Sequence, residues 1–207
     1  MTEVITNIVS FLEKETTELI MINLELSDTF TSTNQTLTEF WDFLNTNVDN
    51  LKEMVYVKEN TIDWPTMSEL QNQTKQLIFF KHRGKDCFEN EGYCPAGGAI
   101  HELFDYSIET TYTLTSESIN NFDESCRKDR GYGNDFYNVN HFVTVSGISS
   151  EDAAIKINQL DFLKKRLSEC EALTNRIVNM VNIDFWNATS ALPKYTQFVN
   201  MNRANKI

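Results

Sequence analysis

The feature that most constrains the fold is an alternation of helical stripes with short apolar runs. Ile5, Ile8, Val9 and Leu12 recur at helical spacing in residues 3–14. Apolar runs of strand length follow at 18–26, 54–57, 76–82, 141–145 and 177–186. Further helical patterns cover 37–48, 64–70, 151–174 and 191–203. The 18–26 run lacks strict polar alternation, as in strands buried on both faces, and the whole pattern predicts a parallel α/β fold.

Two parallel architectures compete. About five strands are evident, fewer than the eight of a (β/α)₈ barrel. A doubly wound sheet closes with fewer strands, but it often carries a glycine-rich phosphate turn. The chain has neither G-x-G-x-x-G nor G-x-x-x-x-G-K-[ST]. We therefore expect a barrel-like α/β fragment.

Residues 83–140 stand apart from this alternation. They hold three of the four cysteines and most of the glycines, and their pattern is irregular. We expect a long loop insertion here, with a short strand near 108–114. Loops of this length in a compact domain are usually functional or specially tethered.

The cysteines bear on the compartment. Four cysteines allow three pairings in principle. Cys87 and Cys94 flank a short loop, so a local bridge is easy, and Cys126 would then pair with Cys170. Sequons at Asn34, Asn72 and Asn187 add little in a chain so rich in asparagine. The pattern favours a secreted protein; the alternative is four reduced cysteines in a cytosolic protein.

Charge and hydropathy exclude other classes. The chain has 207 residues, with 18 Lys and Arg against 30 Asp and Glu, a net charge of −12. This acidity argues against nucleic acid binding, which needs clustered basic side chains. There is no apolar run of about 18 residues, so we expect no transmembrane segment. The first residues lack the basic and apolar regions of a secretion signal.

Candidate functional residues follow from the rule that barrel enzymes place them at the carboxyl ends of strands. Glu25 follows the first apolar run, where a carboxylate can bind a hard cation or act as an acid or base, or is simply a solvated loop residue. His82, Arg83 and Lys85 form a basic cluster that suits an anionic phosphate; the alternative is a solvated loop.

The last apolar run contributes a second set. Asp184 lies in an otherwise apolar strand, so its carboxylate needs a partner, either a structural hydrogen bond or a catalytic histidine. Trp186 is a candidate for substrate contact beside it. His141 is expected to be a hydrogen-bonded structural residue.

Other chemistry is disfavoured. A zinc site from His82, Cys87, Cys94 and His101 does not fit, because the cysteine spacing exceeds that of ordinary zinc motifs. The chain has no G-x-S-x-G and no H-E-x-x-H motif. No complete pair of nucleophile and base is evident.

Several segments together resemble the phosphatidylinositol-specific phospholipase C-like phosphodiesterases, in the secreted microbial branch of that TIM-barrel superfamily. The matching stretches, in the family's order, are Phe11–Leu26, Trp64–Leu70 with Leu77–Phe80, Lys81–Cys87 with Cys94-Pro95, Ser125-Cys126 with Arg130-Gly131, Val139–Thr144 and Asn182–Trp186. The resemblance implies a distorted (β/α) barrel that cleaves phosphodiesters. In the family, one histidine acts as general base and another as general acid, an arginine neutralises the phosphate, and carboxylates orient the histidines.

The resemblance assigns few of these roles here. The family's histidine pair lies in early strands, usually in a T-H-N-S-like segment, and this sequence starts at the helix before the third or fourth strand. None of His82, His101 and His141 matches the pair. Asp184 matches the last-strand carboxylate, and Glu25 lies near a calcium-binding glutamate of some relatives. The secreted branch does not generally require that metal, so we expect no cofactor. The two cysteine pairs resemble bridges of that branch.

These expectations lead to one principal reading of the chain. Residues 1–207 are expected to be the C-terminal part of one barrel domain, inactive until the missing N-terminal part completes it. The expected partner is a phospholipid or another phosphodiester substrate. A rival reading is a non-catalytic secreted binding or effector protein that uses the loops at 83–140. A third is a cytosolic α/β protein whose resemblance is coincidental.

Overall fold

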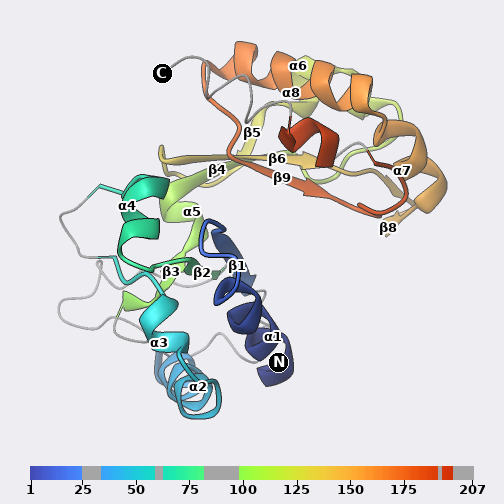
Figure 1. The fold of residues 1–207 in the computed structure, drawn as a ribbon. Coiled ribbons are helices and arrows are strands. Elements are labelled where there is room, and N and C mark those ends of the chain that lie inside the picture. Colours follow the sequence, from blue (N-terminus) through green and yellow to red (C-terminus); the bar gives the residue numbers. More distant parts are fainter. Residues whose placement is uncertain (25–33, 59–62, 82–97, 191–192, 198–207) are drawn as a thin grey trace. The chain divides into compact units, whose positions relative to one another are not determined.

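The computed structural model describes residues 1–24, 34–58, 63–81, 98–190 and 193–197 (Figure 1). Side chains of helix α2 are described from Leu37 onward. The chain divides into two compact units, Met1–Asp105 and Tyr106–Ile207, and each is treated by itself.

The first unit contains a three-stranded parallel sheet. Strands β1 (Ile20–Leu24), β2 (Leu77–Lys81) and β3 (Ile100–Glu102) lie in the order β1-β2-β3. β2 is buried along its whole length, as expected for a central strand of a parallel sheet. β1 instead alternates, with Met21 38% exposed, so the expectation that both of its faces are buried is wrong.

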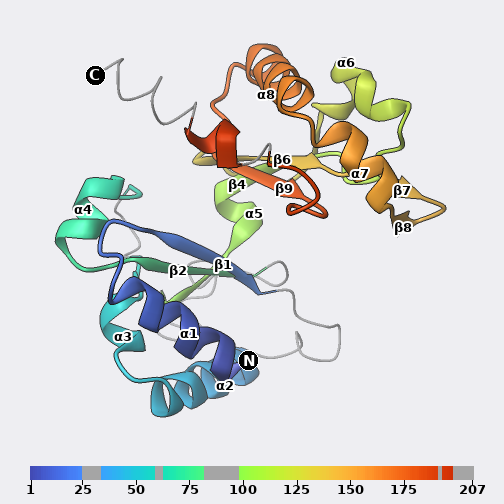
Figure 2. The same cartoon turned by 45° about the vertical axis from the view of Figure 1, so that its right-hand side comes forward.

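Helices α1 (Thr2–Leu12), α2 (Asn34–Asn47) and α3 (Leu51–Met54) cover one face of this sheet (Figure 2). The helical stripe predicted near the N-terminus is confirmed, because Ile5, Val9 and Leu12 are buried in the core. The strand expected at 54–57 is wrong: α3 ends at Met54, and Val55 makes only an isolated bridge to Leu77.

Helix α4 (Met67–Asn72) begins where the sequence predicts. The Thr66 hydroxyl accepts from the Glu69 backbone N–H at 3.2 Å, and the Thr66 N–H donates to the Glu69 carboxylate at 2.7 Å. This reciprocal capping box satisfies two backbone groups at the helix start.

The second unit contains a four-stranded mixed sheet in the order β5-β4-β6-β9. Strands β4 (Ser107–Thr110), β6 (Phe136–His141) and β9 (Met180–Ile183) are parallel, and β5 (Lys128–Arg130) is antiparallel to β4. His141 therefore ends a strand instead of opening one. The last strand is shorter than the expected 177–186.

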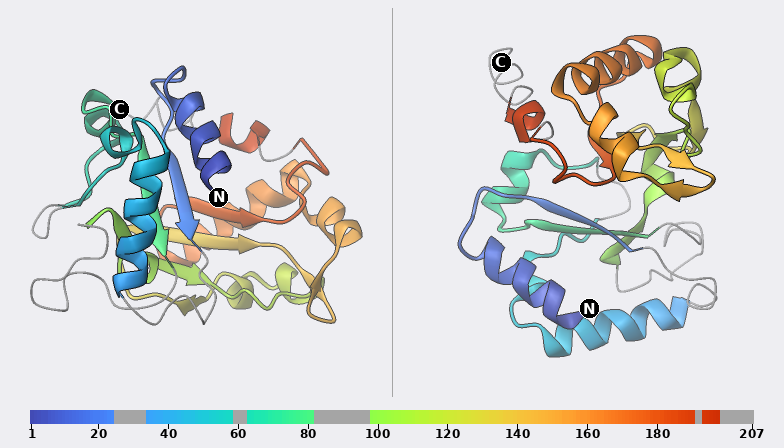
Figure 3. Two further views of the ribbon diagram at one scale, coloured as in Figure 1. Left: turned by 90° about the horizontal axis from the view of Figure 1, so that it is seen from below. Right: turned by 90° about the vertical axis from the view of Figure 1, so that its right-hand side faces the viewer.

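Helices α6 (Phe122–Ser125), α7 (Glu151–Ile157) and α8 (Leu160–Thr174) belong to this unit (Figures 1 and 3). Leu163 and Leu167 of α8 pack on Val139 in its core. The Cys126–Cys170 disulfide, with a Cα–Cα distance of 5.0 Å, lies in the same core and confirms the predicted pairing.

The expected single helix at 151–174 is broken at Asn158. Its side chain donates to the Asp184 backbone carbonyl at 2.9 Å, and the backbone of Gln159 is extended. This tertiary hydrogen bond separates α7 from α8 although the apolar stripe runs through both.

The region expected to be a long loop is more regular than its composition suggests. Its described part holds strands of both sheets and three short helical segments. In chain order these elements are β3, α5 (Leu103–Tyr106), β4, η2 (Ser118–Asn120), α6, β5 and β6. A β-hairpin of β7 (Thr144–Val145) and β8 (Ile148–Ser149) replaces the end of the strand expected at 141–145.

The fold is thus mixed α/β with parallel strands, as predicted. Over the described ranges the strands form open sheets and no closed barrel. No helix in the described part of the chain is both long and apolar enough to cross a lipid bilayer.

Candidate functional site

The sheet of the second unit has one apolar and one polar face. Ile108, Tyr137 and Val139 point to the face that packs with α8 in the core. Glu109 pairs in register with Asn138, and Asn140 with Asn182, so these side chains project from the opposite face. We call that set the polar strip; its members are Ser107, Glu109, Asn138, Asn140 and Asn182.

A hydrogen-bond chain runs along the polar strip. The Asn140 amide donates to the Glu109 carboxylate at 2.7 Å and to the Thr110 carbonyl at 2.8 Å. The Asn182 amide donates to Asn140 Oδ1 at 2.9 Å. Three parallel strands thereby hold their polar side chains in a fixed mutual arrangement.

Arg130 supplies a cation at one end of the chain of bonds. Its Nε and Nη2 lie 3.0 and 2.8 Å from Glu109 Oε2, and its guanidinium lies 4.3 Å from the Tyr112 ring centroid. The Glu109 side chain is 3% exposed whereas that of Arg130 is 37% exposed. The buried carboxylate is neutralised by a guanidinium that still has access to solvent.

Two members of the polar strip keep unused hydrogen-bonding capacity. Ser107 Oγ and Asn138 Oδ1 are buried and have no partner among the described residues. Such groups normally find a partner, because burying them without one costs free energy. Ser107, Glu109, Asn138 and Asn140 are at most 2% exposed, whereas Asn182 on β9 is the exposed member of the strip.

Asp184 lies directly after β9. Its Oδ2 accepts from the Ser149 hydroxyl at 2.5 Å, and the residue is half-buried. The carboxylate therefore has a structural hydrogen bond, one of the two partners that the sequence left open. Trp186, two residues later, is 63% exposed.

His141 is fully buried beneath α7 and α8. Its Nε2 donates to the Ile157 carbonyl at 3.1 Å, and Arg166 Nη1 lies 3.4 Å from its Nδ1. Burial and the Arg166 charge lower the pKa of His141 to about 3. The imidazole is neutral at pH 7 and serves a structural role, as the sequence predicted.

Arg166 is itself buried on α8. Its Nη2 donates to the Ser125 carbonyl at 3.1 Å, while its Nε has no partner in the described part of the chain. Burial lowers the pKa of Arg166 to about 10. Arg166 therefore contacts a neutral imidazole nitrogen of His141. Backbone carbonyl oxygens of Ser125 and Ile157 accept the other hydrogen bonds of the two side chains.

His101 of the first unit lies in an aromatic setting. Its ring centroid is 5.3 Å from that of Trp64, 5.9 Å from that of Phe80 and 6.5 Å from that of Tyr56. The side chain is 0% exposed. Among the described residues no group of three or more His, Cys, Asp or Glu is placed to hold a metal ion.

The carboxyl edge of the first sheet carries a buried ion pair. Lys81 Nζ at the end of β2 lies 2.9 Å from Glu102 Oε2 at the end of β3, and both side chains are at most 5% exposed. Burial raises the pKa of Glu102 above its ordinary value, and the Lys81 ammonium only partly opposes this effect. Lys81 is the last residue of β2 and Glu102 is the last residue of β3. Barrel enzymes place functional residues at this end of their strands.

Several predicted site residues lie outside the described residues: Glu25, His82, Arg83, Lys85, Cys87 and Cys94. Of the sequon asparagines, Asn72 and Asn187 are exposed, whereas the side chain of Asn34 is not described. The structure thus brings Asp184 near Ser149 but does not test the basic cluster.

Sequence reasoning missed the polar strip. The available signal was the alternation of Asn138 and Asn140 with Val139 and His141, together with Ser107 and Glu109 in the next strand. In a strand, such a period of two places polar side chains on one face. Only sheet pairing shows that the polar faces of three strands coincide.

Comparison with known proteins adds the family. No curated protein and no solved structure gives a significant match to the chain. The family model PI-PLC X 1 matches residues 1–199, which is nearly the whole chain. The parallel strands of both units fit this assignment broadly. The chain therefore belongs to the PI-PLC X domain family.

Proposed function

We propose that this chain contributes the later strands of a (β/α) barrel that hydrolyses the phosphodiester bond of phosphoinositide-type lipids. The family match over residues 1–199 is the observation that carries the proposal. The parallel strands, with polar side chains on the face away from the helices in the second unit, support it. Barrel enzymes commonly build their sites from residues on several parallel strands.

The chemistry is general acid–base catalysis with charge stabilisation. A base takes the proton of the attacking hydroxyl, the new phosphorus–oxygen bond forms, and an acid protonates the leaving oxygen. We assign neither histidine role to this chain, because His141 is neutral and hydrogen-bonded inside the core. The histidine pair is expected to come from a segment that completes the barrel.

The chain's own residues bind and orient in this proposal. Ser107 Oγ and Asn138 Oδ1, which have no partner among the described residues, hydrogen-bond hydroxyl groups of the head group, and the Arg130 guanidinium pairs with an anionic oxygen. Asp184 orients the imidazole of the base. Arg83 and Lys85, in the basic cluster, contribute positive charge for the phosphate, and Trp186 contacts lipid.

We further propose that the protein acts outside the cell. The Cys126–Cys170 disulfide supports this location, since such bridges persist mainly in oxidising compartments. No cofactor is needed for acid–base cleavage by a histidine pair, so none is proposed.

The test is release of water-soluble inositol phosphate from phosphatidylinositol vesicles. The assay compares the chain alone with the product of the same gene that includes any coding sequence upstream of Met1. Turnover is expected only from a product that supplies the histidine pair. If neither product cleaves phosphatidylinositol or a glycosyl-phosphatidylinositol, the enzymatic proposal fails.

Asp184→Asn in the active protein tests the orienting role. Loss of a group that orients a catalytic side chain lowers turnover by about tenfold or more. The matched control is Asp161→Asn, an exposed acid in the first turn of α8. Unchanged turnover in Asp184→Asn would leave its bond to Ser149 as a purely structural contact.

A second candidate function is a non-catalytic binding protein with the same barrel elements. The burial of both His101 and His141 favours it, because neither imidazole is open to solvent. This candidate predicts that the chain alone binds inositol phosphates in calorimetry without cleaving any phosphodiester. Asn138→Ala, which removes the unpartnered amide oxygen, should weaken that binding.

A further inference from the structure

Helix α4 ends in a Schellman motif. Gln73 is its C-cap, and the next residue, Thr74, has a φ of 58°. The Thr74 N–H donates to the Gln71 carbonyl at 3.0 Å, and the Lys75 N–H donates to the Leu70 carbonyl at 2.8 Å. These two bonds satisfy carbonyl groups at the end of the helix, and the motif places the residue after the C-cap in the left-handed conformation.

Thr74 is an unexpected residue for this position. Glycine, and less often asparagine, normally occupies it, because a left-handed backbone crowds a side chain. A β-branched residue at positive φ is an outlier and costs free energy. The Thr74 side chain is exposed, and among the described residues its hydroxyl donates only to the carbonyl of Gln73, at 2.6 Å. Packing therefore gives no reason for a threonine here.

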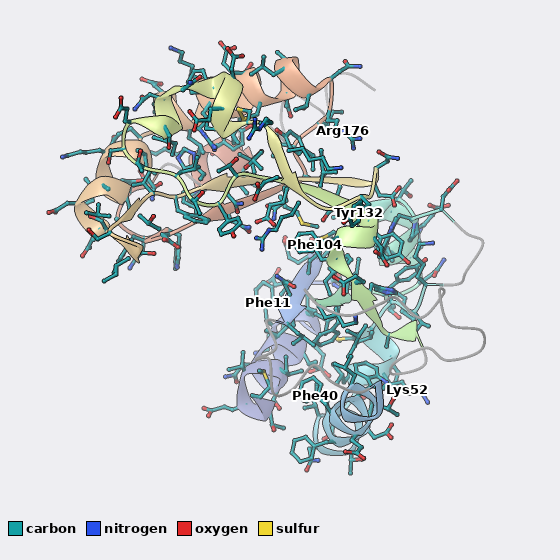
Figure 4. All side chains as sticks on the ribbon, turned by 180° about the vertical axis from the view of Figure 1, so that it is seen from behind. Phe11, Phe40, Lys52, Phe104, Tyr132 and Arg176 are labelled. Atoms are coloured by element: carbon teal, nitrogen blue, oxygen red, sulfur yellow. A yellow bond between two sulfur atoms is a disulfide. The ribbon has the colours of Figure 1, made fainter. Side chains whose placement is uncertain are left out.

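Contacts outside the helix hold the turn in place. Lys75 Nζ donates to the Glu53 carbonyl at 2.7 Å and to the carbonyl of Lys52, labelled in Figure 4, at 3.3 Å. The Gln71 amide donates to the Thr17 carbonyl at 2.6 Å. Because the surrounding structure fixes the turn, the residue after the C-cap takes the left-handed conformation despite its cost.

The hydroxyl of Thr74 completes an acceptor motif for N-linked glycosylation. The motif N-x-[ST] needs a hydroxyl two residues after the asparagine, and Asn72-Gln73-Thr74 supplies it. Asn72 is the last residue of α4, and all three residues are exposed. A bulky, polar glycan attached here would therefore extend into solvent.

The other two sequons differ from this one. At Asn187-Ala188-Thr189, the Thr189 hydroxyl is half-buried and donates to the Asn158 carbonyl at 2.5 Å, so it already has a structural role. The side chain of Asn34 lies outside the described residues. A high asparagine content can produce a sequon by chance, but it does not explain a strained threonine whose hydroxyl has no other use.

We propose that Asn72 carries an N-linked glycan and that Thr74 is retained at a strained position to supply the hydroxyl of the acceptor motif. The inference rests on the extracellular location proposed above, because such motifs are used in secreted proteins. In the transfer, Asn72 Nδ2 loses a proton to the medium and bonds to the anomeric carbon of a lipid-linked oligosaccharide diphosphate. The bond from that carbon to the diphosphate oxygen breaks, and the lipid diphosphate leaves with the electron pair.

Mass spectrometry of the protein secreted by cells that express the full gene tests the proposal. Trypsin cleavage after Lys58 and Lys75 yields peptide 59–75, which contains a single sequon. Peptide-N-glycosidase removes the glycan and converts the linked asparagine to aspartate, and water labelled with heavy oxygen marks the new carboxylate. The label is expected at position 72, and the untreated peptide should carry the mass of an oligosaccharide.

Three variants separate the roles of the two residues. Asn72→Gln should remove the glycan. Thr74→Ser keeps the acceptor hydroxyl and should keep the glycan, whereas Thr74→Val keeps the shape of threonine without the hydroxyl and should lose it. Where a variant is poorly secreted, the same peptide is taken from the endoplasmic reticulum fraction.

The strain at Thr74 is measured separately from the glycan. In the Asn72→Gln background, where no glycan is attached to α4, Thr74→Gly should raise the urea midpoint of the first unit, because glycine adopts positive φ without a steric penalty. The matched control is Gln73→Gly at the neighbouring residue, whose φ is −92°. It should lower the midpoint, because glycine loses more conformational freedom on folding.

Three outcomes would overturn the proposal. The first is an unmodified peptide 59–75 in the secreted protein. The second is a glycan that persists in Thr74→Val, and the third is a midpoint that does not rise in Thr74→Gly. None of these measurements depends on catalysis. A glycan at Asn72 in a protein that cleaves no phosphodiester would support the inference while the proposed enzymatic function fails, and cleavage by a protein without this glycan would do the reverse.

Discussion

The buried ion pair between Lys81 and Glu102 offers a quantitative test of the first unit. The two side chains are 2% and 5% exposed, and their charged atoms lie 2.9 Å apart. Lys81→Met keeps the length of the side chain but leaves the Glu102 carboxylate buried without its ammonium partner. Breaking a buried pair from one side typically costs about 3–5 kcal/mol of unfolding free energy, so we expect a loss in that range at pH 7.

The pH dependence sharpens the prediction. Burial raises the pKa of Glu102 in the folded state above its ordinary value in the unfolded chain. At a pH between these two values the folded state therefore binds a proton that the unfolded chain does not. Removing Lys81 adds to this shift. As pH falls through the folded-state pKa towards the ordinary value, protonation removes the buried charge, and the deficit of Lys81→Met should shrink.

Urea unfolding followed by tryptophan fluorescence measures these effects. Trp41 and Trp64 lie in the first unit, and Trp186 is the remaining tryptophan. In a Trp186→Phe background the signal therefore reports on the first unit alone. The exposed Lys14→Met is the matched control and should change the unfolding free energy by no more than about 0.5 kcal/mol.

The double variant Lys81→Met/Glu102→Met decides whether the pair is coupled. Removing both charges leaves no unpaired ion, so its unfolding free energy should lie close to that of the parent chain. The reasoning is refuted if the unfolding free energy of Lys81→Met lies within about 1 kcal/mol of that of the parent chain. It is also refuted if the loss of unfolding free energy in the double variant equals the sum of the losses in the two single variants.

Two further predictions concern the second unit. Cys126→Ala/Cys170→Ala opens a loop with a sequence separation of 44 residues and should lose about 4 kcal/mol of unfolding free energy by the chain-entropy relation, measured in urea against the oxidised parent; equal midpoints would contradict this. Burial and the Arg166 charge lower the pKa of His141 to about 3 in the folded state. The stability that depends on the neutral imidazole is therefore complete above about pH 6.5, near the ordinary pKa of histidine. It is lost as the pH falls from there towards 3, by about 1.4 kcal/mol per pH unit. The difference in unfolding free energy between the parent chain and His141→Gln should follow this pH course, and a difference that stays constant from pH 7 to pH 4 would show that His141 is protonated normally in the fold.

Local features of the fold followed from sequence patterns. The stripe in α1 and the Thr66–Glu69 capping box depend on residues three or four apart, so spacing alone determines them. The parallel α/β class follows similarly from alternating periods. The Cys126–Cys170 pairing was also predictable once the other two cysteines were assigned to one short loop.

Boundaries were less predictable where distant groups compete with local preference. The apolar stripe of 151–174 continues through Asn158, but its side chain bonds the Asp184 carbonyl 26 residues away and ends α7. The hairpin after β6 was hidden in a β-prone segment, although Ser146-Gly147 was a usable turn signal.

Sequence alone determined which residues favour helix, strand or turn, and it carried the resemblance to the family. Tertiary structure decided which side chains meet. Glu109 meets Asn140 because β4 pairs with β6, and Lys81 meets Glu102 because β2 pairs with β3. The physical reason is that periodicity assigns a residue to one face of its own strand, whereas the register between strands depends on packing of the whole sheet.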